Sequence, residues 1–505
     1  MSTRARGGLA LVVVAACAVV TARAEAQCLP TSSQRPALCR NDFVIDLYQG
    51  PVLAPLAVTG LGGAYAAIAD GVEGLGQNAA ASAVRPAWSY GWFDYDLALS
   101  ASFPGAFGKT DFDNRGQAGL NSVTFFYTLG AILQFGHFGV GVSGDFQRFA
   151  LPAEPATGVP GTVVQIGRLH ASIAYSFLGD QLVVGGGLRG VRATADTLPP
   201  DASPDALVIL KSENVLSLLG VSPEMGLLIR PDYAPFRVGA TYRRPVDAAG
   251  QPGPTASRDL DGVYRAGGLP LPTRVHWPWE LELGVALSAG PRPLNPKWID
   301  PHEQEGVLRE EIELARRTRR NAQEADVASI EDPARRRDRE RDLALEEKYI
   351  RAEEERRLDR LAGQLLAERR ARFKNWPRDR ILVVAEVLVT GSTDKGISPQ
   401  SFLRREDVPS GLSTSVQPRL GLEGEPVPGT LVARVGTYVE PSRYQIAPQP
   451  GVLAGARQHF TFGGDVRLFS WDVFGLVVPT EWRLTVAADL APRYQNLGLG
   501  IGTWH

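Results

Sequence analysis

Apolar and polar residues alternate with a period of two at several places along this chain. In residues 279–288 the bulky apolar side chains occupy one phase, and acids and small residues occupy the other. Residues 169–177 and 482–490 alternate in the same way. Because residues two apart lie on the same face of a strand, each segment predicts a strand with one apolar and one polar face. Behind an export signal, repeated strands of this kind indicate a transmembrane β-barrel.

The N-terminus predicts export. Arg4 and Arg6 precede an apolar run to Val20, which ends in A-x-A patterns at residues 22–26. This order of charge, apolar run and small residues indicates a signal peptide over residues 1–26. Cys17 lies in a sequence that resembles a lipoprotein cleavage box, so its lipidation is an alternative, although more apolar sequence follows it.

The rest of the composition excludes several classes. No later segment has the ~20 continuous apolar residues that a membrane-spanning helix requires. A formal net charge of -2 argues against a general nucleic-acid binder. After cleavage only Cys28 and Cys39 remain, and in an oxidising compartment they could form a disulfide; two free thiols are the alternative.

Turn signals rich in Gly, Pro and Asp separate about fourteen candidate strands, an even number as bacterial outer-membrane barrels require. The candidates lie near residues 87–100, 122–135, 138–149, 168–178, 181–195, 221–230, 236–245, 277–289, 380–391, 415–424, 430–441, 458–472, 481–491 and 494–504. The predicted fold is an all-β transmembrane barrel of about fourteen antiparallel strands, eight in residues 87–299 and six in residues 378–505. If the last strand ends in the periplasm, connections after even-numbered strands are periplasmic and short.

One connection after an even-numbered strand is long. Residues 300–377 separate the eighth and ninth strands, and roughly half of residues 303–374 are charged, with about nineteen of each sign. Good helix formers with one internal break, at Pro333, predict two helices near 303–329 and 334–374. A solvated spacer without a partner and a periplasmic arm that contacts an envelope protein or peptidoglycan are both compatible with this segment.

The chain shows no catalytic or metal-binding motif. Residues 139–144 match G-x-G-x-x-G, but they lie inside an alternating strand, and no helix pattern follows to hold a pyrophosphate. The six histidines are scattered, without H-E-x-x-H or C-x-x-C spacing, and no G-x-S-x-G elbow appears. The sequence therefore predicts no enzyme, no metal and no cofactor, and a barrel enzyme such as a lipase has no motif in its favour.

Charged residues at inward positions are expected to pair inside the lumen. The acids are Glu280, Glu282, Glu386 and Asp489, and the arginines are Arg237, Arg243 and Arg483. Such pairs usually stabilise a polar lumen, and a catalytic carboxylate pair is the rarer explanation.

A segment rich in Gly and Ala, at residues 60–80, precedes the first strand. Small residues allow tight turns and close packing, which suits a plug within residues 27–86; an ordinary N-terminal extension is the alternative. The segment resembles the N-terminal hatch of the FadL family of outer-membrane transporters for long-chain fatty acids and other hydrophobic compounds. The positions that match the family motif are Gly60, Gly62, Gly63, Ala64, Ala67, Ala69, Asp70, Asn78 and Ala80. Two hairpins, at residues 225–243 and 419–436, are also similar to family patterns.

The resemblance implies a barrel in the outer membrane of a Gram-negative bacterium, with a hatch in its lumen and passive uptake of hydrophobic cargo such as long-chain fatty acids. It also implies sideways release through the wall at a kinked strand, for which Gly139, Gly141 and Gly144 are the candidate region. The expected partners are the lipid bilayer, the cargo and, through residues 303–374, a periplasmic protein or peptidoglycan; nucleic acid is not expected. The alternative function is a structural or adaptor barrel, for secretion or envelope attachment, that works through this arm.

Overall fold

The computed structural model describes residues 36–504, apart from several internal gaps. The gaps are 49, 86–88, 90, 109, 117–123, 152–160, 198–212, 253–256, 259–263, 267–268, 445–454 and 472–479. The predicted signal peptide, Cys17 and Cys28 lie outside the described residues. Cys39 is disulfide-bonded.

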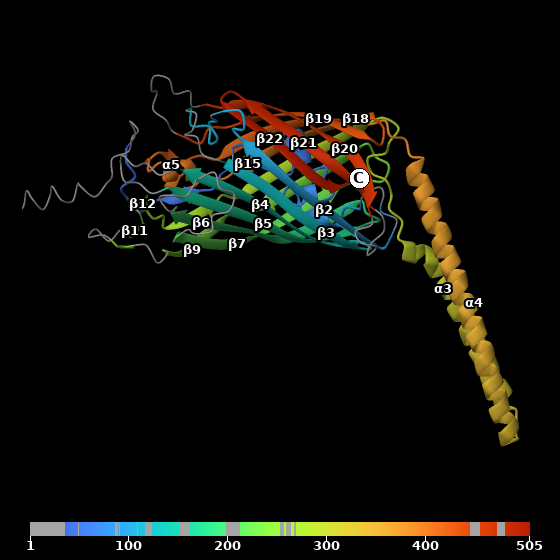
Figure 1. Cartoon of the computed structure of the whole chain (residues 1–505). Helices are drawn as coiled ribbons and strands as arrows, with labels where there is room; N and C mark the ends of the chain where they lie inside the picture. Colours follow the sequence, from blue (N-terminus) through green and yellow to red (C-terminus); the bar gives the residue numbers. More distant parts are fainter. Residues whose placement is uncertain are drawn as a thin grey trace, which may run out of the picture.

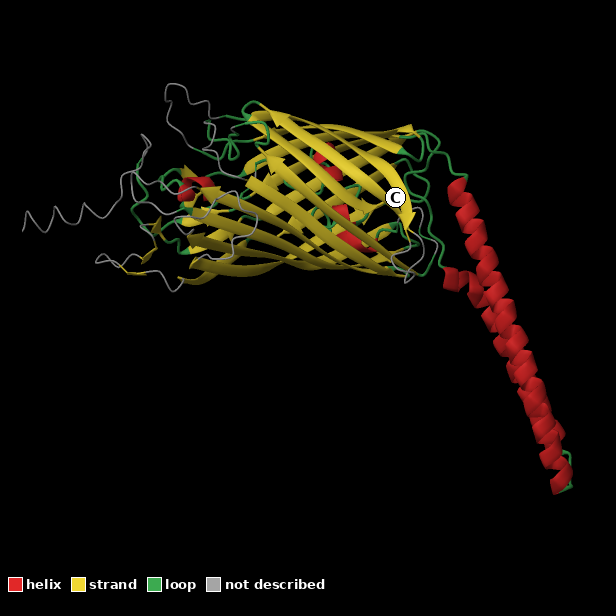
Figure 2. Ribbon diagram, viewed as in Figure 1, coloured by secondary structure: helices red, strands yellow, loops and turns green. Residues whose placement is uncertain are grey.

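Fourteen antiparallel strands form a closed barrel (Figures 1 and 2). In chain order they are β2 (Phe93–Pro104), β3 (Thr124–Phe135), β4 (Phe138–Leu151), β5 (Thr162–Phe177), β6 (Leu182–Thr197), β7 (Glu213–Ile229), β8 (Phe236–Arg243), β14 (Glu280–Ala289), β15 (Ile381–Thr390), β18 (Ser415–Val427), β19 (Leu431–Glu440), β20 (Arg457–Trp471), β21 (Thr480–Ala491) and β22 (Tyr494–Thr503). Each strand pairs with the next, and β2 pairs with β22 to close the wall. The predicted fold class is confirmed, although the first strand begins at Phe93, later than expected.

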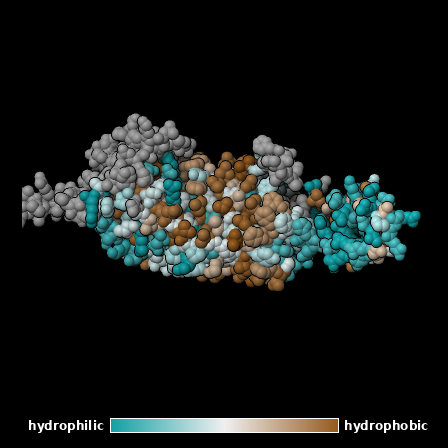
Figure 3. All heavy atoms as spheres, turned by 90° about the horizontal axis from the view of Figure 1, so that it is seen from below, coloured by the Kyte–Doolittle hydropathy of each residue, from teal (hydrophilic) through white to brown (hydrophobic). Residues whose placement is uncertain are grey.

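The outer wall of the barrel is apolar. On β14 the side chains of Leu283 and Leu287 are each 52% exposed, whereas Glu282, on the opposite phase, is 3% exposed and faces the lumen. Figure 3 shows apolar residues gathered over the wall and hydrophilic residues over the two helices that project from it. None of the helices in the described residues combines the length and the apolar character needed to cross a bilayer. The alternation in residues 279–288 thus separates a lipid-facing from a lumen-facing side, as predicted.

The described residues 36–85, here called the hatch, fold inside the barrel (Figure 2). Their short helices are α2 (Leu56–Gly60), η1 (Val72–Gly74) and η2 (Ala79–Ala83). Strand β1 (Val44–Asp46) pairs in parallel with β13 (Arg274–Trp277) and β16 (Gly396–Ile397), near the end of the barrel where the long loops gather. The predicted hatch in the lumen is therefore confirmed.

Glycines of the wall make room for the hatch. A Cβ atom on Gly239 would lie 2.1 Å from the carbonyl oxygen of Ala66, and one on Gly185 would lie 2.4 Å from that of Ala79. Both distances are below the 3.0 Å that real Cβ atoms keep. The wall glycines whose Cβ would meet the hatch, here called the glycine belt, are Gly130, Gly139, Gly141, Gly185, Gly226, Gly239, Gly284, Gly421, Gly436, Gly463 and Gly498. They come from ten strands, so the hatch packs directly against the backbone of the wall around most of the lumen.

Strand β4, where a kink was predicted, is paired without interruption on both sides. It pairs with β3 over residues 138–149 and with β5 over residues 138–151, without a register shift. Its glycines provide space instead. A Cβ on Gly139 would lie 1.8 Å from Ser82 O, one on Gly141 2.5 Å from Leu75 Cδ2, and one on Gly144 2.9 Å from the ring of Phe146.

The insertion forms two antiparallel helices, α3 (Pro301–Ala328) and α4 (Pro333–Lys374), here called the arm. Each begins with an aspartate N-cap followed by proline: Asp300 accepts from His302 N, and Asp332 from Ala334 N. The arm leaves the end of the barrel where β14 ends and β15 begins, and it projects obliquely away (Figure 1). At 1.5 Å per residue α4 is ~60 Å long. The predicted helical insertion is confirmed.

The two ends of the barrel differ in the length of the connections between strands, as predicted from the even number of strands. At the arm end the connections between strands include the short turns 136–137 and 428–430, and the described C-terminus lies there as well (Figure 1). The opposite end, here called the loop end, carries the longer connections, such as residues 391–414 between β15 and β18.

The interface between the two arm helices holds a charge cluster between apolar contacts. Ile312 and Leu343 are buried, at 6% and 8% exposure. In the middle of the arm Glu354 accepts hydrogen bonds from Arg316 Nε at 2.7 Å and from Arg319 Nη2 at 2.6 Å. A charged layer inside a helix pair favours one alignment of the helices, because a shifted pairing would leave these charges without partners.

Acid is expected to loosen the arm. Burial raises the pKa of Glu354, but hydrogen bonds from Arg316 and Arg319 outweigh it, so the pKa lies below its ordinary value of 4.5. Because the folded-state pKa is the lower one, the stabilisation is present above about pH 4.5 and is lost as the pH falls through the folded-state value. Glu354→Gln should lower the midpoint of arm melting at pH 7, followed by circular dichroism at 222 nm, and flatten its acid dependence. The effect should be modest, since surface ion pairs contribute roughly 0.2–1 kcal/mol each.

Glu355→Gln is the matched control for this experiment. Glu355 is exposed and makes no ion pair within the part of the chain that the structure describes. If Glu354→Gln and Glu355→Gln have the same melting midpoint at pH 7 and the same acid dependence, the cluster does not stabilise the arm.

Candidate functional site

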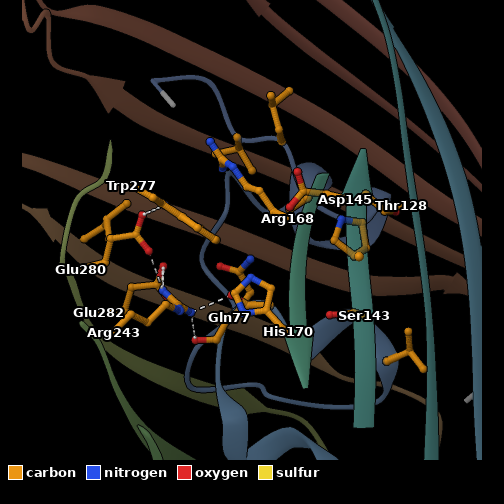
Figure 4. Close-up of a pocket in the computed structure, with 18 of the residues that line it drawn as sticks. Gln77, Thr128, Ser143, Asp145, Arg168, His170, Arg243, Trp277, Glu280 and Glu282 are labelled. Carbon is orange, nitrogen blue, oxygen red and sulfur yellow. Dashed lines mark hydrogen bonds and ion pairs between the residues drawn. The ribbon is translucent and has the colours of Figure 1, made fainter. Parts of the chain in front are cut away.

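A cavity lies between the hatch and the wall, on the side of the hatch that faces the loop end. The hatch contributes residues 51–55 and Gln77, and the strands contribute both apolar and charged side chains. In Figure 4 Trp277, Glu280 and Arg243 lie on one side of this space, and Asp145 and Thr128 on the other. We call it the central cavity.

A second cavity, here called the loop-end cavity, adjoins the central one. Phe112, Phe149 and Ile166 line it and belong to a large buried apolar cluster in the loop-end half of the barrel. Pro51 and Arg168 line both cavities. Arg168 Nη2 donates a hydrogen bond to Leu47 O at 2.6 Å, and this side chain lies between the two cavities.

The wall is interrupted beside the central cavity. Arg244 and Pro245 separate β8 from β9 (Val246–Pro252), and Pro278 and Trp279 separate β13 from β14. Strand β7 pairs with β8 at residues 224–229 and with β9 at residues 216–219. Proline has no backbone N–H to donate to a neighbouring strand. Two adjacent strands are therefore broken next to each other, at a place that we call the wall break.

Arg189 of β6 holds the wall break together from inside. It is fully buried; its Nε donates to Arg244 O at 2.9 Å, and its Nη2 donates to Pro278 O. Its Nη1 also pairs with Glu280 at 2.9 Å, and its guanidinium lies 4.2 Å from the ring centre of Trp277. One side chain thus satisfies two carbonyl groups at the positions where the strands are interrupted.

The expected lumen pairs form in part. Arg243 pairs with Glu280 at 3.3 Å and with Glu282 at 3.2 Å, as predicted. Arg237 pairs with Asp70 of the hatch at 2.8 Å, and Arg483 pairs both with Glu73 of the hatch at 2.7 Å and with Asp465 of β20 at 3.0 Å.

The other two predicted acids also find partners that the sequence did not indicate. Glu386 accepts hydrogen bonds from the backbone N–H groups of Tyr65 and Ala66, at 2.9 and 2.8 Å, and pairs with Arg419. Asp489 accepts from His459 at 2.8 Å. Several of the lumen charges therefore fix the hatch rather than line an open pore.

The hatch positions chosen from the motif lie together in the lumen. Gly60 touches the wall at Gly463, and Gly62 and Gly63 adopt positive φ angles of 66° and 83°, which favour glycine. Ala64 is fully buried. Asn78 caps η2 by accepting from Ala80 N, and its Nδ2 donates to Ala66 O and Leu227 O.

Sequence reasoning missed the residues of the wall break. Pro245 and Pro278 lie inside predicted strands, and proline within a strand pattern is a signal of interruption. The two-residue period places Arg189 on the inward phase of β6, opposite exposed Val184 and Leu188. Its partners, Arg244 O and Pro278 O, are 55 and 89 residues away in sequence and leave no local signal.

Fold and site define a closed transmembrane β-barrel whose lumen is plugged by its own N-terminal segment. Among the described residues no group of three or more His, Cys, Asp or Glu could hold a metal ion.

The chain is similar to several solved barrels of known type. One is a Pseudomonas aeruginosa FadL homologue, at 10% identity over 90% of this chain and 99% of that one, with a TM-score of 0.47. Another is the P. putida toluene transporter TodX, at 11% identity over 90% of this chain and 98% of that one, with a TM-score of 0.45. A third is the CymD monoaromatic hydrocarbon channel, at 11% identity over 89% and 96%, with a TM-score of 0.42. No family model and no curated protein matches the chain. At such identities the similarity concerns the barrel architecture only.

Proposed function

We propose that the protein is a passive channel for hydrophobic small molecules in the outer membrane of a Gram-negative bacterium, exported by a signal peptide at residues 1–26. The observation that carries the proposal is the plugged lumen beside the wall break. The hatch packs against glycines of ten strands, and the central cavity, which adjoins the loop-end cavity, lies beside the wall break. An apolar solute gains free energy by leaving water and loses nothing by entering the bilayer through the wall.

The lining of the two cavities supports an amphipathic or small apolar cargo. The aromatic and aliphatic side chains of the loop-end cavity suit an apolar body. The central cavity adds cations, Arg168, His170 and Arg243, and acids, Asp145, Glu280 and Glu282, which together suit a hydrogen-bonding polar group. A long-chain fatty acid and a monoaromatic hydrocarbon are therefore the two cargoes to compare.

Filling the central cavity should block uptake. Ser143 lies on the cavity side of β4, and Ser143→Trp adds a large ring to the space. We expect initial uptake of labelled oleate or toluene into cells to fall about tenfold, because the ring occupies the space that the cargo has to enter. Adding a bulky ring to a packed site costs ~1–3 kcal/mol, so the cargo and the ring are not accommodated together.

Val142→Trp is the control for this substitution. Val142 is the preceding residue and is 50% exposed on the outer wall, so a tryptophan there meets lipid. Unchanged uptake by Ser143→Trp, with both variants folded, would contradict a route through this cavity.

The projecting arm favours a second candidate function, a barrel that attaches another envelope component or peptidoglycan. A channel does not need a ~60 Å helical projection for cargo to cross the wall. Replacing residues 301–374 by a short turn separates the two functions. We expect unchanged uptake by the shortened protein. Absence of cargo binding by the intact protein, together with loss of a co-purifying envelope partner on shortening, would instead favour attachment.

A further inference from the structure

The base of the arm meets the barrel at a pocket, here called the junction pocket. Its walls come from three distant parts of the chain: the end of the hatch at Arg85, the loop before α3 at Lys297 and Trp298, and the last turn of α4 at Arg372 and its neighbours. The place can be followed in Figure 1, where α4 returns to the barrel before β15.

The junction pocket is lined by cations and by no acid. Four basic side chains contribute to it: Arg85, Lys297, Arg369 and Arg372. Arg85 is neutralised by Asp94 at 2.6 Å. Within the described residues, Lys297 and Arg372 form no ion pair. Arg369 has two acidic neighbours, Asp300 and Glu305. The pocket therefore has a surplus of positive charge that an anion would offset.

A buried hydrogen-bond donor in the same pocket has no acceptor. Trp298 is 8% exposed, and its indole N–H has no hydrogen-bond partner among the described residues. The ring itself is well packed, since the Arg85 guanidinium lies 4.5 Å from its centre and the His137 ring meets it edge-on at 5.2 Å. A buried donor left without a partner costs free energy, so this N–H points to a ligand acceptor.

The pocket borders the lipid-facing wall. Strand β15 starts at Ile381, shortly after the end of α4, and its Ile381 side chain is 60% exposed on the outer wall. Trp376, which lines the pocket, lies between the two and stacks with Arg372 at 5.7 Å. Tryptophan and basic residues gather where a membrane protein meets lipid headgroups. The chain thus runs from the pocket to the apolar wall within a few residues.

We propose that the junction pocket binds the phosphate headgroup of an anionic phospholipid from the leaflet on the arm side. Lys297 and Arg372 contact the phosphate, the Trp298 indole N–H donates to one of its oxygens, and the acyl chains lie along the wall beside Ile381. The bound lipid bridges α4, the loop before α3 and the end of the hatch, and so fixes the base of the arm against the barrel. This site is separate from the central cavity and does not depend on the nature of the cargo.

Lipid retention by the purified full-length protein tests the proposal. The protein in a neutral detergent is mixed with phosphatidylglycerol or phosphatidylethanolamine, and bound lipid is counted by native mass spectrometry. We expect about tenfold preference for phosphatidylglycerol, reduced by salt, because the attraction is between opposite charges at a surface. The double variant Lys297→Gln, Arg372→Gln should lose this preference, and Trp298→Phe, which keeps the ring but removes the donor, should weaken retention several-fold.

The double variant Arg356→Gln, Arg360→Gln removes two positive charges from the exposed middle of the arm and serves as the control. It should retain phosphatidylglycerol as the unaltered protein does. Equal retention of the two lipids, or equal retention by the junction and control variants, would overturn the proposal. Displacement of phosphatidylglycerol by equimolar inorganic phosphate would also overturn it, since the pocket would then take the free anion rather than the lipid.

Discussion

Replacing Gly239 by valine is expected to unseat the hatch and open the lumen to water. The added Cβ would lie 2.1 Å from the carbonyl oxygen of Ala66 and 2.5 Å from its carbonyl carbon, and both are backbone atoms that cannot rotate away. Overpacking a buried site usually costs ~1–3 kcal/mol. Here the hatch cannot shift sideways, because other members of the glycine belt, such as Gly226 and Gly436, hold it equally closely. Planar-bilayer recording should show steady ion conductance from the variant and none from the unaltered protein.

Gly186→Val provides the control on a neighbouring part of the wall. A Cβ at Gly186 of β6 would meet no atom within 4 Å, so the same substitution there should leave conductance and heat stability unchanged. Protease cleavage of the hatch, measured in parallel, should increase in Gly239→Val alone. A closed and equally stable Gly239→Val protein would show that contact between hatch and wall does not keep the lumen shut.

Replacing Arg189 by methionine is expected to loosen the wall break. The change leaves Glu280 without one of its two arginine partners and leaves Arg244 O and Pro278 O without their donor. Removing one partner of a buried ion pair typically costs ~3–5 kcal/mol. Amide hydrogen exchange should accelerate at residues 244–246 and 277–280, and the melting temperature of the barrel should fall.

Arg192→Met is the matched control, because Arg192 lies on the same strand and its side chain is exposed. Arg189→Lys should be intermediate, since lysine keeps the charge but lacks the planar fork that reaches three acceptors. If Arg189→Met accelerates exchange at the wall break and also raises uptake of an apolar cargo, the break is the exit. Unchanged exchange there would exclude Arg189 as the group that closes it.

The wall was predictable because its signal is local. In residues 279–288 lipid and lumen impose opposite preferences on neighbouring residues, so the two-residue period reports the facing of each side chain directly. The arm was predictable for a similar reason. Helix formers on both sides of Pro333 specify two helices independently of contacts with the barrel.

The site was less predictable because its partners are far apart in sequence. A glycine in a strand permits either a bend or a close neighbour, and Gly139 and Gly141 serve the second purpose because Ser82 and Leu75 pack against them. Arg237 and Arg483 were expected to pair with inward acids of the strands. The depth at which the hatch lies decides their partners, Asp70 and Glu73, and no spacing along the strands encodes that depth.

The glycine belt has a consequence for how the protein is assembled. The hatch precedes β2 in the chain, and ten strands of the wall touch it closely. A wall that closed first would leave a ring too narrow for a folded segment to enter afterwards. We therefore expect the strands to assemble around the hatch before the seam between β2 and β22 closes, where Ala98 faces Gly502. The hatch, which does not cross the membrane, thus influences the shape of the barrel wall, which does.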